Sequence, residues 1–458
     1  MNCSYIPPGN QSCGMQLDQS NEWVVLADSI EWGKWEEVYA RNFNSPKGNP
    51  AKSFQMVLGA LLIQKKKGLS DRKLVKEITE NPYLQYFLGM PTFSKEAPFT
   101  APALVYFRKR LSVEMINKIN DDYLKTAEPT PEHDEENESE RAKEVNQPDE
   151  NGNKGTLIMD ATCSLSNIRY PQDFSLLNEA REKLEKMIDF FHETYHPWKK
   201  PRTYREVARK DYLALAKSKK RTEKKIRATV RKMLGYVKRD LGYLEKYMEE
   251  GYALPKKFIN NYLVILELYR QQKYMYDNKV HSVENRIVSL SQPWVRPIVR
   301  GKSKAPTEFV AVIEKYRQRF GYYPGRVLAD KIYRSQANRR YCKEHGIRIS
   351  GPRLGRKTKD NAEEIRQELK EIGERNAVEG KFGNGKRKLG LGLIMGKLKE
   401  TSGSMIGMDI FVLNMEHRMR ECAALCCAFL RNRIITLFGS CIQRSEERCV
   451  GKECRSRW

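Results

Sequence analysis

Three acidic residues, far apart in the chain, have the setting that phosphodiester chemistry requires. Asp160 ends the short apolar run Thr156–Asp160, Asp330 follows a second such run, Arg326–Ala329, and Glu379 lies on a predicted helix. Two divalent ions about 3.5–4 Å apart can activate an attacking oxygen and stabilise a leaving one. Magnesium prefers hard oxygen ligands, which carboxylates supply. The three acids are therefore candidate metal ligands and catalytic residues.

The spacing around Glu379 makes this hypothesis more specific. The acids alone are weak evidence, because the chain has 58 Asp and Glu and a strand-end aspartate can also cap a following helix. Arg375 precedes Glu379 by four positions, which puts both on one helical face. Lys386 follows Glu379 with six residues between them.

This pattern resembles the Tyr-(2)-Arg-(3)-Glu-(6)-Lys signature of the DDE transposases of bacterial insertion sequences. Arg375, Glu379 and Lys386 match in full, and Ile372 stands in place of the tyrosine. Three further stretches resemble blocks of the same family. Residues 53–89 resemble its N-terminal DNA-binding domain. Residues 155–182 resemble its first-aspartate block, with Asp-Ala-Thr and Arg-Tyr-Pro-x-Asp, and residues 324–356 resemble its second-aspartate block.

The resemblance implies an α+β, mostly helical protein with a ribonuclease-H-like core over 156–420 and a helical insertion at 176–285. Asp160 would lie on the first strand, Asp330 just after the fourth, and Glu379 on a late helix. The three carboxylates would bind two Mg²⁺ ions, with Mn²⁺ as an alternative. The enzyme would nick the transposon ends and join the freed 3′-hydroxyl to target DNA, while Arg375 and Lys386 would contact the DNA ends.

The charge of the chain favours a polyanionic partner. It has 458 residues, a formal net charge of +25 and a pI of about 9.5, which makes double-stranded DNA the first candidate. Seventeen Lys or Arg and three acids fall in Lys199–Arg239, a predicted long amphipathic helical region broken at most once. Its candidate DNA contacts are Lys219, Lys220, Lys224 and Lys225.

The remaining segments complete the expected organisation. Residues 20–126 predict a helical DNA-binding domain with a helix–turn–helix, in which Lys65, Lys66, Lys67, Arg72 and Lys73 would position phosphates. Residues 127–155 predict a disordered acidic linker, and residues 421–443 a C-terminal helix. Residues 444–458 resemble translated adapter read-through. No apolar run is long enough to span a membrane, so we expect a cytoplasmic, nucleoid-associated prokaryotic protein that acts on DNA as a homodimer or larger assembly.

One departure from the family bears on activity. In the family, a segment like Lys304–Phe309 is followed by two strands and a turn, whereas here Val310 leads directly into the next predicted helix. Either Arg286–Leu290 and Val295–Arg300 supply the missing strands, or the chain is a decayed copy. The alternative function is then a catalytically weak transposase that acts only as a DNA-binding protein.

Another motif, His192-Glu-Thr-Tyr-His196, fits the H-E-x-x-H pattern of zinc sites. Pro197 ends the helix at once, and no third ligand follows at the required spacing. We therefore interpret it as a helix terminus rather than a zinc site.

Overall fold

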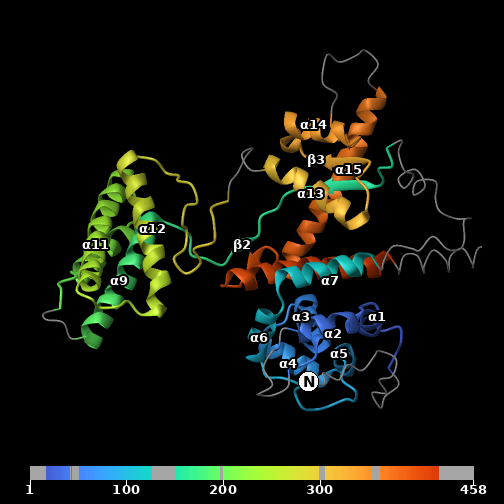
Figure 1. Cartoon of the computed structure of the whole chain (residues 1–458), viewed down its shortest axis with the longest axis horizontal. Coiled ribbons are helices and arrows are strands. Elements are labelled where there is room, and N and C mark those ends of the chain that lie inside the picture. The colour runs from blue at the N-terminus through green and yellow to red at the C-terminus, as the bar shows by residue number, and fades with distance from the viewer. Residues whose placement is uncertain are drawn as a thin grey trace, which may run out of the picture. The chain divides into compact units, whose positions relative to one another are not determined.

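The computed structural model describes residues 17–41, 43, 51–125, 151–195, 200–298, 305–351 and 362–421 (Figure 1). The chain divides into two compact units, which we describe separately. The first comprises the chain up to Thr162, Ala305–Gly392 and the residues from Gly403 onward. The second comprises Cys163–Lys304 and Leu393–Ser402.

The first unit begins with a block of short helices whose ends follow local chemistry. The Ser53 side chain accepts a hydrogen bond from the Met56 N–H at the start of α3, and Gly68 ends that helix in the left-handed conformation. Ser70 caps α4, and Asn81 caps α5, with a proline at its first position. The helices are α1 (Glu22–Asp28), α2 (Trp32–Ala40), α3 (Phe54–Lys67), α4 (Asp71–Glu80), α5 (Pro82–Phe87), α6 (Ala103–Arg110) and α7 (Val113–Lys125).

Residues 403–421, which are helical throughout, pack onto this N-terminal block (Figure 1). Phe411 makes an edge-to-face contact with Tyr123 of α7, with ring centroids 5.5 Å apart. The Ser404 hydroxyl donates to the carbonyl of Leu111 over 2.7 Å. The end of the stretch that we assigned to the catalytic core thus forms part of the N-terminal hydrophobic core.

A small parallel sheet forms the centre of the rest of the first unit. Its strand order is β1 (Thr156–Met159), β3 (Arg326–Ala329) and β4 (Arg348–Ile349). Strands expected at 156–160 and 326–329 are therefore present. Among the described residues β1 pairs only with β3, so it is an edge strand with backbone groups available on its other side.

Helices cover both faces of this sheet, as the alternation of side chains requires. Val327 and Ala329 face a small core that includes Phe309 of α13 (Ala305–Phe320) and Cys342 of α14 (Gln336–Glu344). Arg326, which points to the opposite face, forms an ion pair with Glu374 of α15 (Ala362–Asn384) at 3.0 Å. A π-helical turn, η2 (Gly385–Leu389), extends α15.

The second unit is a helical bundle. Its apolar core gathers side chains from α9 (Asp173–Tyr195), α11 (Glu223–Glu249) and α12 (Lys256–Asn278), with α10 (Arg205–Ala216) packed alongside. The basic region Lys199–Arg239, predicted as helical and broken at most once, contains α10 and the first part of α11, which residues 217–222 separate. Two short strands, β2 (Leu165–Ser166) and β5 (Leu393–Ile394), pair in parallel.

The strand predicted at Arg286–Leu290 is wrong. These residues are irregular, and Ile287 and Leu290 are buried in the core of the second unit. The Ile287 N–H donates to the side-chain oxygen of Gln271 on α12 over 2.9 Å. Because an apolar run of this length can pack as coil or as strand, its composition could not decide between them. Residues 295–298 are also irregular, and 299–300 lie outside the described residues. Neither segment is seen to supply a missing strand.

Several predicted features lie wholly or partly outside the described residues. These are the acidic segment up to residue 150, His196, the helix beyond residue 421, and the tail at 444–458. The last part of the expected linker is folded, because the Lys154 N–H donates to the carbonyl of Tyr323 over 2.9 Å and buried Asn153 donates to the carbonyl of His345. No helix in the described parts of the chain is both long and apolar enough to cross a membrane.

Candidate active site

The register of two strands places Asp160 and Asp330 side by side. Met159 of β1 pairs with Ala329 of β3 in a parallel ladder. Each aspartate is the next residue along its strand, so both carboxylates leave the sheet at its carboxyl edge. Each is half-buried, and each accepts a hydrogen bond from the following backbone N–H, over 2.8 Å at Ala161 and 2.6 Å at Lys331.

Tyr333 lies close enough to sense both carboxylates. Its ring is buried and stacks on Phe309, with centroids 6.1 Å apart. Burial raises the pKa of the Tyr333 phenol, and the negative charges of Asp160, Glu308 and Asp330 raise it further. The phenol therefore stays protonated at neutral pH. Tyr333 was not identified from the sequence, where its only signal is its position three residues after Asp330.

Helix α15 is tied to the same part of the sheet by charged groups. Glu371 is buried and forms an ion pair with Arg348 of β4, and Glu374 pairs with Arg326 of β3. The Arg375 guanidinium lies 3.7 Å from Oδ1 of Asp330. The helix thus brings one residue of the sequence signature to the pair of aspartates. The two glutamates that fix the helix were not identified from the sequence.

Glu379 and Lys386 lie further along the same segment. Glu379 is exposed, one turn beyond Arg375 and on the same helical face, and Lys386 is partly exposed in η2. Four residues of helix span about 6 Å along the axis. Within the described ranges, no three His, Cys, Asp or Glu residues are grouped closely enough to hold a metal ion. The structure therefore brings together Asp160, Asp330 and Arg375, but not Glu379 with the two aspartates.

The four candidate DNA-binding lysines of the second unit are all exposed. Lys219 and Lys220 lie between α10 and α11, and Lys224 and Lys225 lie in the first turn of α11. Positive charge at a helix N-terminus opposes the helix dipole, so these lysines do not help α11 to form. Their position fits a surface that meets a polyanion.

Some basic residues of the N-terminal block pair with carboxylates, and others are exposed. Lys65 lies 2.6 Å from the buried carboxylate of Asp409, Lys66 lies 3.2 Å from Glu22, and Lys67 pairs with Glu77. These three lysines already have carboxylate partners. Arg72 and Lys73 are exposed on α4 and remain candidates for contacts with DNA.

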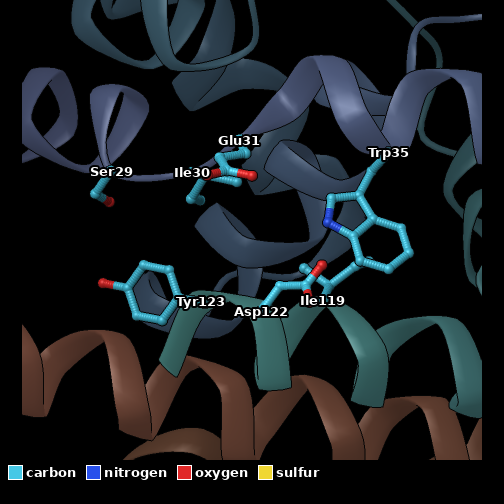
Figure 2. Close-up of a pocket in the computed structure, with 7 residues that line it drawn as sticks. All are labelled: Ser29, Ile30, Glu31, Trp35, Ile119, Asp122 and Tyr123. Carbon is cyan, nitrogen blue, oxygen red and sulfur yellow. The ribbon is translucent and has the colours of Figure 1, made fainter. Parts of the chain in front are cut away.

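An enclosed pocket in the first unit is not a substrate site. It lies between the helices α1 and α2 and the helix α7, and Figure 2 shows the seven side chains around it, among them Trp35, Asp122 and Tyr123. Its volume of about 10 Å³ is about the space that one water molecule occupies. An open hollow over α14 is lined instead by polar and mostly charged side chains: Gln336, Arg339, Arg340, Lys343 and Glu344.

Comparison with known proteins identifies the domains at both ends of the described chain. Residues 11–110 match the family model "Transposase domain (DUF772)", and residues 327–416 match the model "Transposase DDE domain". The two matches support a DDE transposase of an insertion sequence. The second match includes Asp330, Arg375, Glu379 and Lys386, whereas Asp160 precedes it.

One curated relative of this chain is named only as an uncharacterized protein. The uncharacterized protein ORF8 in the nfe locus of Rhizobium meliloti is 32% identical over 96 residues, which make up 21% of this chain and 46% of that protein. The chain thus aligns with about half the length of the curated relative. No solved structure matches the chain.

Proposed function

We propose that the chain is a transposase that binds the terminal inverted repeats of an insertion sequence, nicks the transposon ends and joins the 3′-hydroxyl to target DNA. The observation that carries this proposal is the parallel register of β1 and β3, which sets Asp160 beside Asp330 next to the matched transposase segment. Arg375, at 3.7 Å from Asp330, adds a cation where a scissile phosphate would approach.

The two aspartates fit a hard divalent cation such as Mg²⁺ by donor chemistry and by accessibility. Both offer carboxylate oxygens at the open edge of the sheet, which is the ligand type that magnesium takes. Glu379 is not grouped with them, so in this arrangement it does not complete a three-carboxylate site. When bound, the divalent ions would supply charge stabilisation and an activated oxygen nucleophile.

The roles of the residues themselves follow from their places. Asp160 and Asp330 would hold the metal ions, and Glu379 would supply the third carboxylate in the complex with DNA. Arg375 and Lys386 would bind the phosphates of the DNA ends. Buried Tyr333, as a neutral hydrogen-bond donor, would support the aspartates without competing for the metal. The N-terminal helical block would recognise the inverted repeats, and the three-stranded sheet with α13, α14 and α15 would be the remaining part of a ribonuclease-H-like core. DNA synapsis would require two or more copies of the chain.

A second candidate function is DNA binding without efficient cleavage. Two observations favour it. Helix α13 runs without interruption through Phe309 and Val310, where the family has two additional strands, and the described residues contain no group of three acids that could hold a metal ion. A misplacement of about 1 Å in a catalytic group can cost about 100-fold in rate.

Cleavage of a duplex that carries the inverted repeats flanking its gene tests both functions. An active transposase nicks this DNA when Mg²⁺ is added, and Asp330→Asn abolishes nicking but not DNA binding. Asp277→Asn on α12, where the aspartate pairs with Lys273 of the same helix, is the matched control and leaves nicking unchanged. Binding with no nicking by the unaltered chain supports the second function. Absence of DNA binding would contradict both.

A further inference from the structure

A short segment of the second unit, residues 200–204, is held along the middle of α11. The Arg239 guanidinium donates to the carbonyl of Thr203 over 2.9 Å, and the Tyr243 hydroxyl donates to the carbonyl of Arg202 over 3.5 Å. Thr203, within this segment, is buried. The segment is thus fixed by side chains that recur on one face of α11.

Tyr204, the last residue of this segment, has an unusual backbone conformation for its type. Its φ is +51°, in the left-handed region that glycine and asparagine adopt most easily. It precedes α10 without providing a side-chain cap. Such conformations often occur at functional sites. The ring remains 45% exposed, so burial of the ring does not offset the strain.

The exposed ring of Tyr204 belongs to a series of stacked arginine and tyrosine side chains. The Arg202 guanidinium carbon lies 5.1 Å from the ring centroid of Tyr204, and that of Arg239 lies 4.7 Å from it. Arg239 also lies 5.2 Å from the ring of Tyr236. Alternating guanidinium groups and rings offer flat, cationic faces at the protein surface, on which a nucleobase can stack.

The charges around this stack favour an anionic ligand. Neighbouring Lys200 and Arg205 are both paired with Asp189, at 2.7 Å. Arg202, in contrast, has no carboxylate partner among the described residues, and Arg239 lies 3.8 Å from Asp240 without a hydrogen bond to it. Of the two cations that stack on Tyr204, Arg202 is therefore the one with charge left for a phosphate.

We propose that the Tyr204 surface, formed by Arg202, Tyr204, Tyr236, Arg239 and Tyr243, binds unpaired nucleotides of DNA. The rings and guanidinium groups stack with exposed bases, and Arg202 contacts the adjoining phosphate. A fully paired duplex hides its base faces, so the surface distinguishes opened DNA from closed DNA. The inference rests on the proposed function, since a nick at a transposon end lets the nucleotides beside the nick separate from their partners.

Binding of full-length protein to two synthetic DNAs tests this inference. One is a blunt duplex, and the other is the same duplex with four unpaired nucleotides at a 3′ end, one of them the fluorescent base 2-aminopurine. Tyr204→Gly removes the ring and suits the left-handed conformation, so the variant is expected to fold at least as well as the unaltered chain. Tyr204→Phe keeps the ring. Tyr274→Ser on α12 changes another exposed tyrosine of the same unit and serves as the matched control.

We expect the unaltered protein to prefer the unpaired end and to quench 2-aminopurine fluorescence. Tyr204→Gly should weaken binding to that DNA about tenfold and abolish quenching, with blunt-duplex binding unchanged. Tyr204→Phe and Tyr274→Ser should behave as the unaltered chain.

Three outcomes would overturn the inference. Equal affinity of Tyr204→Gly and the unaltered chain for the unpaired end would show that the stack only fixes the segment to α11. An equal loss on both DNAs would assign the surface to duplex phosphates. Failure of the unaltered chain to bind either DNA would contradict the proposed function as well, whereas normal blunt-duplex binding with no effect at Tyr204 would contradict this inference alone.

Discussion

The ammonium group of Lys65 lies 2.6 Å from Oδ1 of Asp409, and the Asp409 side chain is completely buried. Lys65 lies in the last turn of α3 in the N-terminal block, and Asp409 lies in the helical stretch 403–421. This ion pair therefore joins two parts of the chain that are more than 340 residues apart in sequence. It also explains why Lys65 is not a free phosphate ligand.

The Asp409 pair should make the stability of the first unit depend on pH. Burial raises the pKa of Asp409 to about 6, although Lys65 opposes this shift. Since the folded state then binds the proton more tightly than the unfolded state, the free energy of unfolding should rise as pH falls from about 7 toward 4. Denaturant unfolding at a series of pH values measures this effect.

Asp409→Asn is the comparison that isolates this carboxyl group. Asp240 in the second unit also has a raised pKa, about 7, mainly because it is buried, but its contribution is common to both proteins and cancels in the difference. The free energy of unfolding of the variant, compared with that of the unaltered chain, should therefore be higher at pH 7 than at pH 4. Identical pH profiles for the two proteins would refute a raised pKa at Asp409.

The lysines around the start of α11 should contribute to the salt dependence of DNA binding. Each neutralised phosphate adds about −0.9 to the slope of log affinity against log salt. Replacing Lys219, Lys220, Lys224 and Lys225 with glutamine should reduce the magnitude of that slope by up to about 3.6 if all four contact phosphates. Fluorescence anisotropy over a range of NaCl concentrations measures it.

A matched control replaces Lys246 and Lys273 with glutamine. Both lie on helices of the same unit and pair with a carboxylate four residues away. Their replacement should leave the slope almost unchanged. A slope that is equal in the fourfold variant and the unaltered chain would show that the four lysines face solvent and do not touch DNA.

Metal binding by the DNA-free protein should depend unequally on the three acids. Because Asp160 and Asp330 share one edge of the sheet, and the described residues contain no group of three acids that could hold a metal ion, Asp330→Asn should weaken binding of Mn²⁺ far more than Glu379→Gln does. Electron paramagnetic resonance of free Mn²⁺ measures the affinity. Asp277→Asn is again the control. Equal losses from Asp330→Asn and Glu379→Gln would indicate that the three acids already form one site without DNA.

Features set by local chemistry were predictable from the sequence, and features set by distant packing were not. Gly68, Ser70 and Asn81 mark helix ends because capping depends only on neighbouring residues. The strand at Arg286–Leu290 was wrongly predicted because its apolar residues fill the core of a helical bundle. The packing of 403–421 on the N-terminal block has no local signal at all.

In the candidate site, too, some features could be predicted from the local sequence and others depend on distant packing. Two aspartates after short apolar runs are recognisable in the sequence, and parallel pairing of those runs is enough to bring the aspartates together. The position of Glu379 depends instead on how α15 lies over the sheet. That position is fixed by Arg326 and Arg348, which pair with Glu374 and Glu371, and no sequence motif marks these contacts. The role of Glu379 as a third metal ligand stays a prediction.

The edge position of β1 leads to a prediction about catalytic competence. Backbone groups on the free side of β1 lack a partner strand among the described residues, so Asp160 is held by pairing on one side only. We expect the chain as it stands to bind DNA but to nick it poorly. Inserting a two-stranded hairpin between Phe309 and Val310 should recover Mg²⁺-dependent nicking, because it would give β1 a second neighbour and fix the Asp160 carboxylate. Gel electrophoresis of labelled DNA ends measures the nicking.

The insertion must leave the packing of Phe309 intact, since this residue is completely buried and stacks on Tyr333. A flexible Gly-Ser insertion of equal length at the same junction is the matched control. It interrupts α13 in the same way but cannot pair with β1, so it should not recover activity. Glu379→Gln in the hairpin-restored protein should abolish nicking again if Glu379 is the third ligand. Efficient nicking and strand transfer by the unaltered chain would show that a three-stranded sheet suffices to hold Asp160 in place.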